Sequence, residues 1–138
     1  MAQVARQLSN AQRSTTSARP TVLVVDDEAK LRDLTRRILE EAGYEVLEAE
    51  DGQAALELVN GTQAPVDVVL TDIRMPLMNG WQLAAALTSR QPIVPVVLMS
   101  GFGSAPEQSF YPTVNFLAKP FSGEALLALV RRVLAPAA

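Results

Sequence analysis

Residues 21–28 read TVLVVDDE, and this stretch determines how the rest of the chain is interpreted. The aliphatic and β-branched run over Thr21–Asp26 has the length and composition of a strand that is buried on both faces. Such strands belong to parallel sheets that helices cover on either side. Because Asp26 and Asp27 end the run, the stretch predicts a buried strand that delivers acids to one edge of a sheet.

Helices and strands alternate downstream of this strand. A helix is predicted over Glu28–Ala42, because apolar residues recur at helical spacing and Gly43 supplies a stop signal. Its apolar stripe comprises Leu31, Leu34, Ile38, Leu39 and Ala42. The other predicted strands are Tyr44–Leu47, Val66–Thr71, Val94–Met99 and Val114–Leu117, and the other predicted helices are Asp51–Asn60, Trp81–Ser89 and Ser122–Leu134. This alternation favours an α/β fold, a doubly wound parallel sheet with helices on both faces.

The segment between Ser100 and Val114 departs from the alternation. A fourth helix is expected there, but Pro106 and Pro112 bracket only Glu107–Tyr111. Proline suits the first turn of a helix and disrupts its interior. We therefore expect this helix to be short or irregular.

Polar residues follow four of the predicted strands. They are Asp26 and Asp27, then Asp72, Ser100 and Lys119. In an open parallel sheet the carboxyl ends of the strands meet at one edge, where ligands bind. Taken singly, each residue has an ordinary explanation, as a helix cap, a loop residue or a solvated lysine. Their joint placement at one edge predicts a functional site.

The residue types at this edge indicate one kind of chemistry. Neighbouring carboxylates repel one another unless a cation lies between them. The chain has no histidine and no cysteine, so the ligands are hard oxygens, which select Mg²⁺ or a similar ion. A lysine and a hydroxyl beside such an ion suit phosphoryl transfer.

Composition excludes several other classes. The net charge of −3 gives no general attraction to nucleic acid. No cysteine is available for disulfides or thiolate metal sites. The longest apolar run, Ala125–Val130, is far shorter than the roughly 20 residues that span a bilayer, so we expect no membrane contact and a cytoplasmic location.

The ends of the chain differ from the domain between them. Residues 1–20 are rich in Gln, Ser, Thr and Ala, and they contain three arginines and no acid, which predicts a flexible arm or linker. The domain is expected over residues 21–135, with residues 136–138 as a tail. Because the last predicted helix ends near Ala138, we expect no C-terminal output domain.

These segments together resemble the response regulator receiver domain (CheY-like) of two-component signalling. The matching residues are Val22–Glu28, Leu70–Pro76 with Met78 and Gly80, Met99–Gly101 and Lys119–Phe121. The resemblance covers about residues 21–135. It implies a flavodoxin-like (βα)5 fold with strand order 2-1-3-4-5.

The resemblance also implies a role for each residue of the site. Asp72 would be the phosphorylated nucleophile. Mg²⁺ would be held by Asp26, Asp27, Asp72 and the backbone carbonyl of Arg74. Lys119 would contact the phosphoryl group, after a cis peptide bond to Pro120.

Further residues are implied as phosphoryl ligands and switch elements. Ser100 and the backbone of Gly101 and Ile73 would bind the phosphoryl oxygens. Ser100 and Phe116 would move together when the nucleophile is modified. The partner would be a sensor histidine kinase or a histidine phosphotransfer protein, and the chain would be a signalling domain rather than an enzyme.

One departure from the family pattern falls between Ser100 and Lys119, and several alternatives stay open. Ser100 and Lys119 are 19 positions apart, about three fewer than the family leads us to expect, and the missing residues fall in the fourth helix. The chain could be a single-domain regulator or the C-terminal receiver of a hybrid histidine kinase. The functional alternatives are a Mg²⁺-dependent phosphohydrolase with an aspartyl nucleophile and a receiver that only binds a partner.

Overall fold

The computed structural model describes residues 19–61, 65–90, 92–101 and 114–135, so the arm up to residue 18, the predicted fourth helix and the tail lie outside the described residues. The described strands are β1 (Thr21–Val25), β2 (Glu45–Ala49), β3 (Val68–Asp72), β4 (Val96–Ser100) and β5 (Val114–Ala118). The described helices are α2 (Ala29–Glu41), α3 (Gly52–Gly61), α4 (Gly80–Thr88) and α5 (Gly123–Leu134). The strands pair in parallel in the order β2-β1-β3-β4-β5, which confirms the predicted fold class and strand order.

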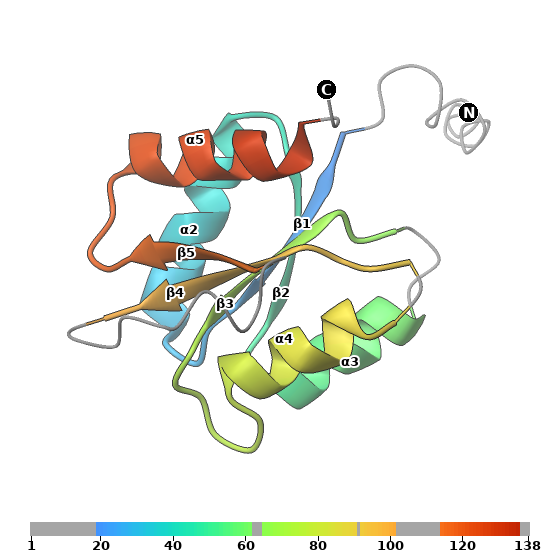
Figure 1. Ribbon diagram of the computed structural model, residues 1–138. Helices are drawn as coiled ribbons and strands as arrows, with labels where there is room; N and C mark the ends of the chain where they lie inside the picture. The colour runs from blue at the N-terminus through green and yellow to red at the C-terminus, as the bar shows by residue number, and fades with distance from the viewer. Residues whose placement is uncertain (1–18, 62–64, 91, 102–113, 136–138) are drawn as a thin grey trace, which may run out of the picture.

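Helices cover both faces of the sheet (Figure 1). On one face α2 and α5 pack through Leu39, Leu126 and Leu129. On the other face α3 and α4 pack through aliphatic residues such as Ala55 and Leu83. None of the described helices is long and apolar enough to cross a membrane.

The burial of β1 explains its uninterrupted apolar sequence. Val22 and Val24 face α2 and α5, whereas Leu23 and Val25 face α3 and α4. All four side chains are fully buried. Successive residues of a strand point to opposite faces, so a strand covered on both sides needs apolar residues at every position.

Most strand and helix limits differ from the predicted ones by one or two residues, while the starts of β1 and β5 and the end of α5 match. The prediction ends β2 at Leu47, but the strand continues to Ala49, which pairs with Val25 and accepts a hydrogen bond from the Asp26 amide at 3.2 Å. Pairing with β1 thus determines where β2 ends, and the local sequence does not indicate this limit. Gly43 ends α2 as expected, at a φ of 102° that favours glycine.

The predicted apolar stripe of α2 is wrong at Ala42, an exposed residue just past the helix end, and at Leu34. This side chain is 53% exposed, and Thr35 is buried in its place. Thr35 satisfies its hydroxyl within the helix by donating to the Leu31 carbonyl at 2.8 Å. Neighbouring helical residues lie 100° apart, so the orientation that buries Leu39 and Thr35 turns Leu34 toward solvent.

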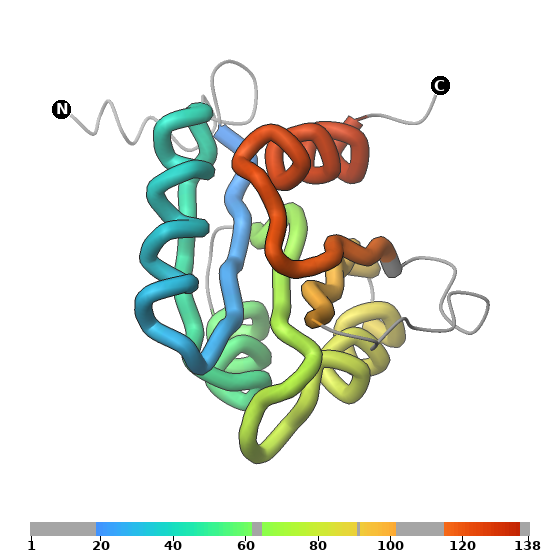
Figure 2. Tube along the Cα trace, turned by 90° about the vertical axis from the view of Figure 1, so that its left-hand side faces the viewer, coloured from blue at the N-terminus to red at the C-terminus, as the bar shows by residue number. Residues whose placement is uncertain are grey.

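The loop between β3 and α4 extends beyond the body of the domain (Figure 2). Leu77 at its tip is 81% exposed and has a φ of 70°. The loop ends in a capping box, in which Asn79 and Gln82 each bind the backbone amide of the other. The Gly80 amide then donates to the Ile73 carbonyl at 2.8 Å, which closes the loop at its base.

Gly80 lies where a side chain has no room. A Cβ atom there would lie 2.5 Å from the Asp72 carbonyl oxygen and 2.9 Å from the Ile73 Cα. We predict that Gly80→Ala lowers the free energy of unfolding by about 1–3 kcal/mol, because the backbone must shift. Gly61→Ala is the control, since its Cβ would meet nothing within 4 Å. Equal losses in the two variants, measured by urea denaturation, would contradict the steric argument.

Candidate functional site

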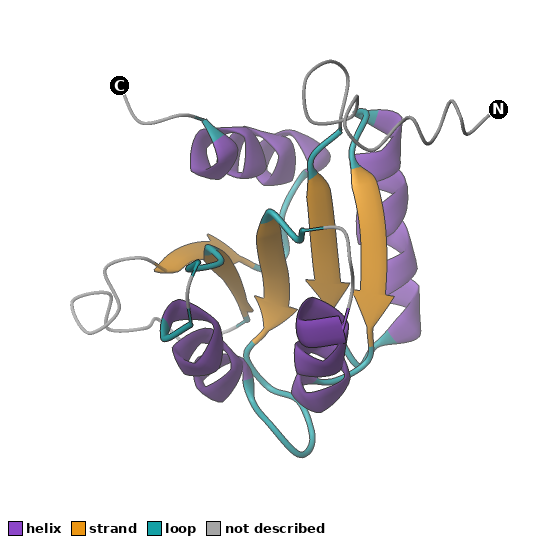
Figure 3. Ribbon diagram, turned by 90° about the vertical axis from the view of Figure 1, so that its right-hand side faces the viewer, coloured by secondary structure: helices purple, strands orange, loops and turns teal. Residues whose placement is uncertain are grey.

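The predicted polar residues lie together at the carboxyl edge of the sheet. Figure 3 shows neighbouring strands pointing to one edge, where the loops that leave them gather. A pocket of about 250 Å³ opens there, lined by Asp72, Ile73, Arg74, Met99, Ser100, Gly101 and Lys119. Parallel pairing brings these residues together, although they are far apart in the sequence.

Three carboxylates form the acidic part of the site. Asp26, Asp27 and Asp72 each offer an oxygen atom, and these atoms lie within 4.8 Å of one another. Asp26 and Asp27 follow β1, and Asp72 is the last residue of β3. The three acids span the range from buried through half-buried to exposed, so the cluster is open to solvent on one side.

Asp26 is the buried member of this cluster, with 1% of its surface exposed. Its Oδ1 accepts a hydrogen bond from the Glu28 amide at 2.9 Å, and its Oδ2 has no hydrogen-bond partner. Burial raises the pKa of Asp26 above its ordinary value of 3.8, and the neighbouring charges of Asp72 and Asp27 raise it further. The Glu28 amide and Lys119 act in the opposite direction. The charged form of Asp26 therefore lacks full compensation.

Lys119 supplies positive charge to the acidic cluster. Its Nζ lies 3.2 Å from Asp72 Oδ1 and 3.6 Å from Asp26 Oδ2. The Lys119 amide donates to the Ser100 carbonyl at 2.7 Å, which fixes the end of β5 against β4. The Lys119–Pro120 peptide bond is cis, as the resemblance implies.

The remaining predicted residues occupy different positions around the pocket. Ser100 is buried at the end of β4. Gly101 and Arg74 line the pocket beside it. The Ile73 amide, a predicted phosphoryl ligand, donates to the Met99 carbonyl at 3.3 Å and would have to leave it to bind an anion.

Phe116 lies away from the pocket lining. It belongs to β5 and packs into the core between the sheet and the α3 and α4 helices. Its ring centroid is 5.7 Å from that of Trp81 on α4, with the ring planes tilted by 52°. Phe116 is therefore positioned to couple β5 to α4, and it makes no part of the pocket wall described above.

Two interactions of the site were not anticipated from the sequence. Arg32 Nη1 donates to the Asp26 carbonyl at 2.6 Å, and the Thr71 hydroxyl donates to the Asp72 carbonyl at 2.9 Å. Both reach backbone atoms, which no side-chain motif signals. The helix-cap explanation of the acids also fails in one respect, because Glu28, the N-cap of α2, makes no side-chain capping hydrogen bond.

The donor set fits a hard divalent cation. It consists of carboxylate oxygens around a position where Asp26 Oδ2 is buried without a hydrogen bond. Buried carboxylates are stable when they pair with a cation or a donor, and oxygen donors without nitrogen or sulfur suit Mg²⁺. The site can therefore hold a cation between the acids, with Lys119 at its rim.

Comparison with known proteins agrees with this site. The family model described as "Response regulator receiver domain" matches residues 22–131. The transcriptional regulatory protein FixJ of Bradyrhizobium diazoefficiens is 33% identical over 112 residues, which cover 79% of this chain and 54% of FixJ. The transcriptional regulatory protein CpxR of Escherichia coli is 32% identical over 116 residues, which cover 82% of this chain and 48% of CpxR.

Solved structures give the same result. The chemotaxis protein CheY4 of Vibrio cholerae is 32% identical and superposes with a TM-score of 0.75. The alignment covers 85% of this chain and 100% of that chain. The receiver domain of the hybrid histidine kinase CckA is 30% identical, with a TM-score of 0.71 over 83% of this chain and 99% of that domain.

The chain belongs to the response regulator receiver family, whose members are phosphoacceptor domains of two-component signalling. It spans about half the length of curated relatives such as FixJ, of which it covers 54%. The similarity therefore concerns the receiver domain of these larger regulators.

We predict that Asp26→Asn stabilises the protein in EDTA and removes its response to Mg²⁺. The raised pKa means that folding disfavours the charged carboxylate, so stability is lost as pH rises from 3.8 through the folded-state pKa, and at pH 7 the charge is a cost. A gain of about 1 kcal/mol would raise the melting temperature by roughly 3–5 °C. Wild type gains about 1.4 kcal/mol when Mg²⁺ is at ten times its dissociation constant.

Asp33→Asn is the control for this prediction. Asp33 is an acid of α2 whose pKa is lowered by Arg36 and Arg37, so its neutralisation does not stabilise the fold. Differential scanning calorimetry with and without Mg²⁺ should show an intact Mg²⁺ response in this variant. A Mg²⁺ response in Asp26→Asn as large as that of wild type would show that Asp26 is not a ligand.

Proposed function

We propose that this chain accepts a phosphoryl group on Asp72 from a phosphohistidine of a sensor histidine kinase or a histidine phosphotransfer protein. The observation that carries the proposal is the position of Asp72. Its Oδ1 lies 3.2 Å from Lys119 Nζ, and the residue lines an open pocket within the acidic cluster. A carboxylate between a lysine and a cation site suits nucleophilic attack on phosphorus.

The transfer exchanges one bond to phosphorus for another. A carboxylate oxygen of Asp72 attacks the phosphorus atom, and the new P–O bond forms as the P–N bond to the donor breaks. The electron pair of the broken bond stays on the ring nitrogen, so the protonated donor ring leaves as neutral imidazole. No further reactant is needed, because the imidazole of the donor histidine is the leaving group of the transfer.

The residues around Asp72 support this reaction by position and charge. Lys119 would face the oxygens that carry negative charge during transfer, and Ser100 and the Gly101 amide, from residues that line the same pocket, would donate hydrogen bonds to them. Mg²⁺ bound by Asp26, Asp27, Asp72 and the Arg74 carbonyl would neutralise phosphoryl charge.

The phosphoryl donor lies outside these residues, because the 138-residue sequence contains no histidine. Similarity to FixJ and to the CckA receiver is consistent with two settings, a regulator and a receiver of a hybrid kinase. In either setting we expect the domain to work in the cytoplasm, where it would meet its donor.

Phosphorylation would then act as a conformational switch. The product carries about two negative charges where a single carboxylate stood, so the loop after β3 and the end of β4 at Ser100 would adjust. Ser100 would move toward the new phosphoryl oxygens, and Phe116 would shift with it. The output is a change in the populations of two surface states.

We predict that acetyl phosphate with Mg²⁺ adds one phosphate to wild type and none to Asp72→Asn. The adduct is an acyl phosphate and should therefore be labile to hydroxylamine. Intact-mass spectrometry measures both properties. Asp51→Asn is the matched control, because asparagine can replace the aspartate that caps the Ala54 amide and Asp51 lies outside the acidic cluster.

The outcomes separate the proposal from its alternatives. An unchanged adduct in Asp72→Asn would place the modification elsewhere. Absence of an adduct in wild type, together with no transfer from any phosphorylated histidine kinase tested, would favour a domain that only binds a partner. Continuous release of phosphate at many turnovers per minute would indicate a phosphohydrolase.

A further inference from the structure

We propose that Arg32 is a positioning residue of the metal site, which orients Asp26 and Asp27 by holding the peptide group between them. The inference rests on the metal pocket within the proposed function. It concerns a side chain of α2 that lines no part of the pocket described above. Its charge also has the wrong sign for a cation ligand, so its contribution must come from geometry.

The contact of Arg32 is with the backbone of the site. Arg32 Nη1 donates to the Asp26 carbonyl oxygen at 2.6 Å, and the Arg32 side chain is 20% exposed. A short hydrogen bond from a charged donor in a largely buried position is among the stronger kinds. It restrains rotation of the Asp26–Asp27 peptide plane, and that rotation would swing the Asp27 carboxylate away from the other two acids.

The other hydrogen bonds of Asp26 do not restrain rotation of the Asp26–Asp27 peptide plane. The Asp26 amide donates to the Ala49 carbonyl at 3.2 Å, which fixes the peptide before it. Asp26 Oδ1 is held by the Glu28 amide at 2.9 Å. Arg32 therefore completes the restraint of the turn from its carbonyl side.

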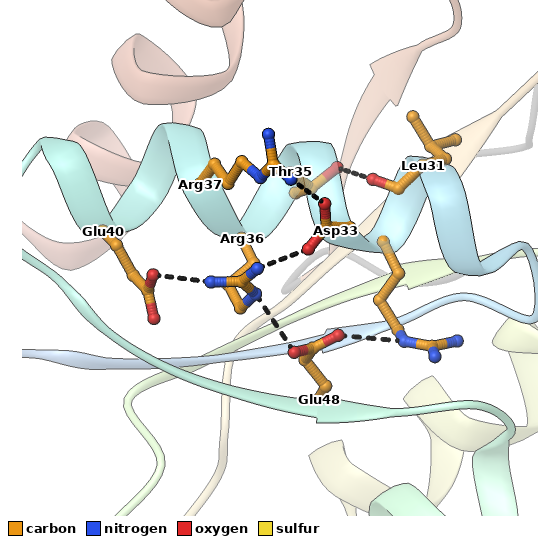
Figure 4. A network of polar contacts seen from close by, with 8 residues as sticks. Leu31, Asp33, Thr35, Arg36, Arg37, Glu40 and Glu48 are labelled. Carbon is orange, nitrogen blue, oxygen red and sulfur yellow. Dashed lines mark hydrogen bonds and ion pairs between the residues drawn. The ribbon is translucent and has the colours of Figure 1, made fainter.

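Arg32 is itself held by the edge strand. Its Nε donates to Glu48 Oε1 at 3.1 Å, and Glu48 Oε2 lies 3.2 Å from Arg36 Nε. Figure 4 shows Glu48 beneath α2 and Arg36 reaching toward Asp33, Glu40 and Glu48. Only a guanidinium offers several donors in a fixed fork, so one side chain can bind Glu48 and the Asp26 carbonyl together.

Arg36 provides a matched control for Arg32. Both arginines lie on α2 and both pair with Glu48, but the contacts of Arg36 are with acidic side chains rather than with the metal-site backbone. Loss of either side chain removes an ion pair with β2. Among the described contacts, Arg32 alone of the two reaches the Asp26 carbonyl, whereas Arg36 also pairs with Asp33 and Glu40 on its own helix.

The experiment measures Mg²⁺ binding to the full chain by isothermal titration calorimetry, for wild type, Arg32→Met and Arg36→Met. We expect Arg32→Met to weaken Mg²⁺ binding about 10-fold, as loss of a residue that orients metal ligands commonly does. Arg36→Met should keep the wild-type dissociation constant for Mg²⁺, even if its melting temperature falls as far as that of Arg32→Met. Arg32→Lys, which keeps the charge without the fork, should also weaken binding.

The sign of the effect distinguishes positioning from electrostatics. Removal of a positive charge near the site would tighten cation binding if charge alone mattered. Tighter or unchanged binding in Arg32→Met, or equal weakening in Arg36→Met, would overturn the inference. Glu48→Gln keeps the Arg32 side chain but removes the charge of its partner, so it should weaken Mg²⁺ binding by less than Arg32→Met does. This variant replaces Arg32→Met in the test if Arg32→Met does not fold. Failure of wild type to bind Mg²⁺ would instead refute the metal centre itself, and the inference with it.

Discussion

Mutual repulsion among three carboxylates is the constraint on which the rest of this structure depends. Their oxygens lie within 4.8 Å of one another, and one of the three acids, Asp26, is buried. Such an arrangement is unfavourable unless positive charge is close at hand. Lys119 approaches it from β5, and the backbone of the turn after β1 is held by Arg32 from α2. The stable core of the sheet is what permits the acids to be kept together.

Much of the fold was predictable because its determinants are local. A strand covered on both faces needs apolar side chains along its buried length, and Val22–Val25 of β1 and Val68–Leu70 of β3 show this directly in the sequence. The site was predictable for a related reason, since Asp26 and Lys119 follow strands and Asp72 ends one, and the ends of these strands must converge in a parallel sheet. Strand limits, such as the extension of β2 to Ala49, depend on pairing and were missed.

Other features could not be predicted because they depend on orientation in three dimensions. The rotation of α2 buries Thr35 and exposes Leu34, although leucine is the more apolar of the two. The hydrogen bond from Arg32 ends on a backbone carbonyl, an atom that every residue carries and no motif marks. The steric role of Gly80 likewise appears only when the approach of the Asp72 carbonyl is known.

The ring contact between Trp81 and Phe116 has a practical consequence. Trp81 is the only tryptophan of the chain, so its indole is the sole source of tryptophan fluorescence in these 138 residues. Its ring centroid lies 5.7 Å from that of Phe116, and indole emission responds to the packing and polarity of its immediate surroundings. The fluorescence emission of Trp81 is thus an intrinsic probe of the contact between α4 and β5, and it follows relative movement of the two elements without an added label.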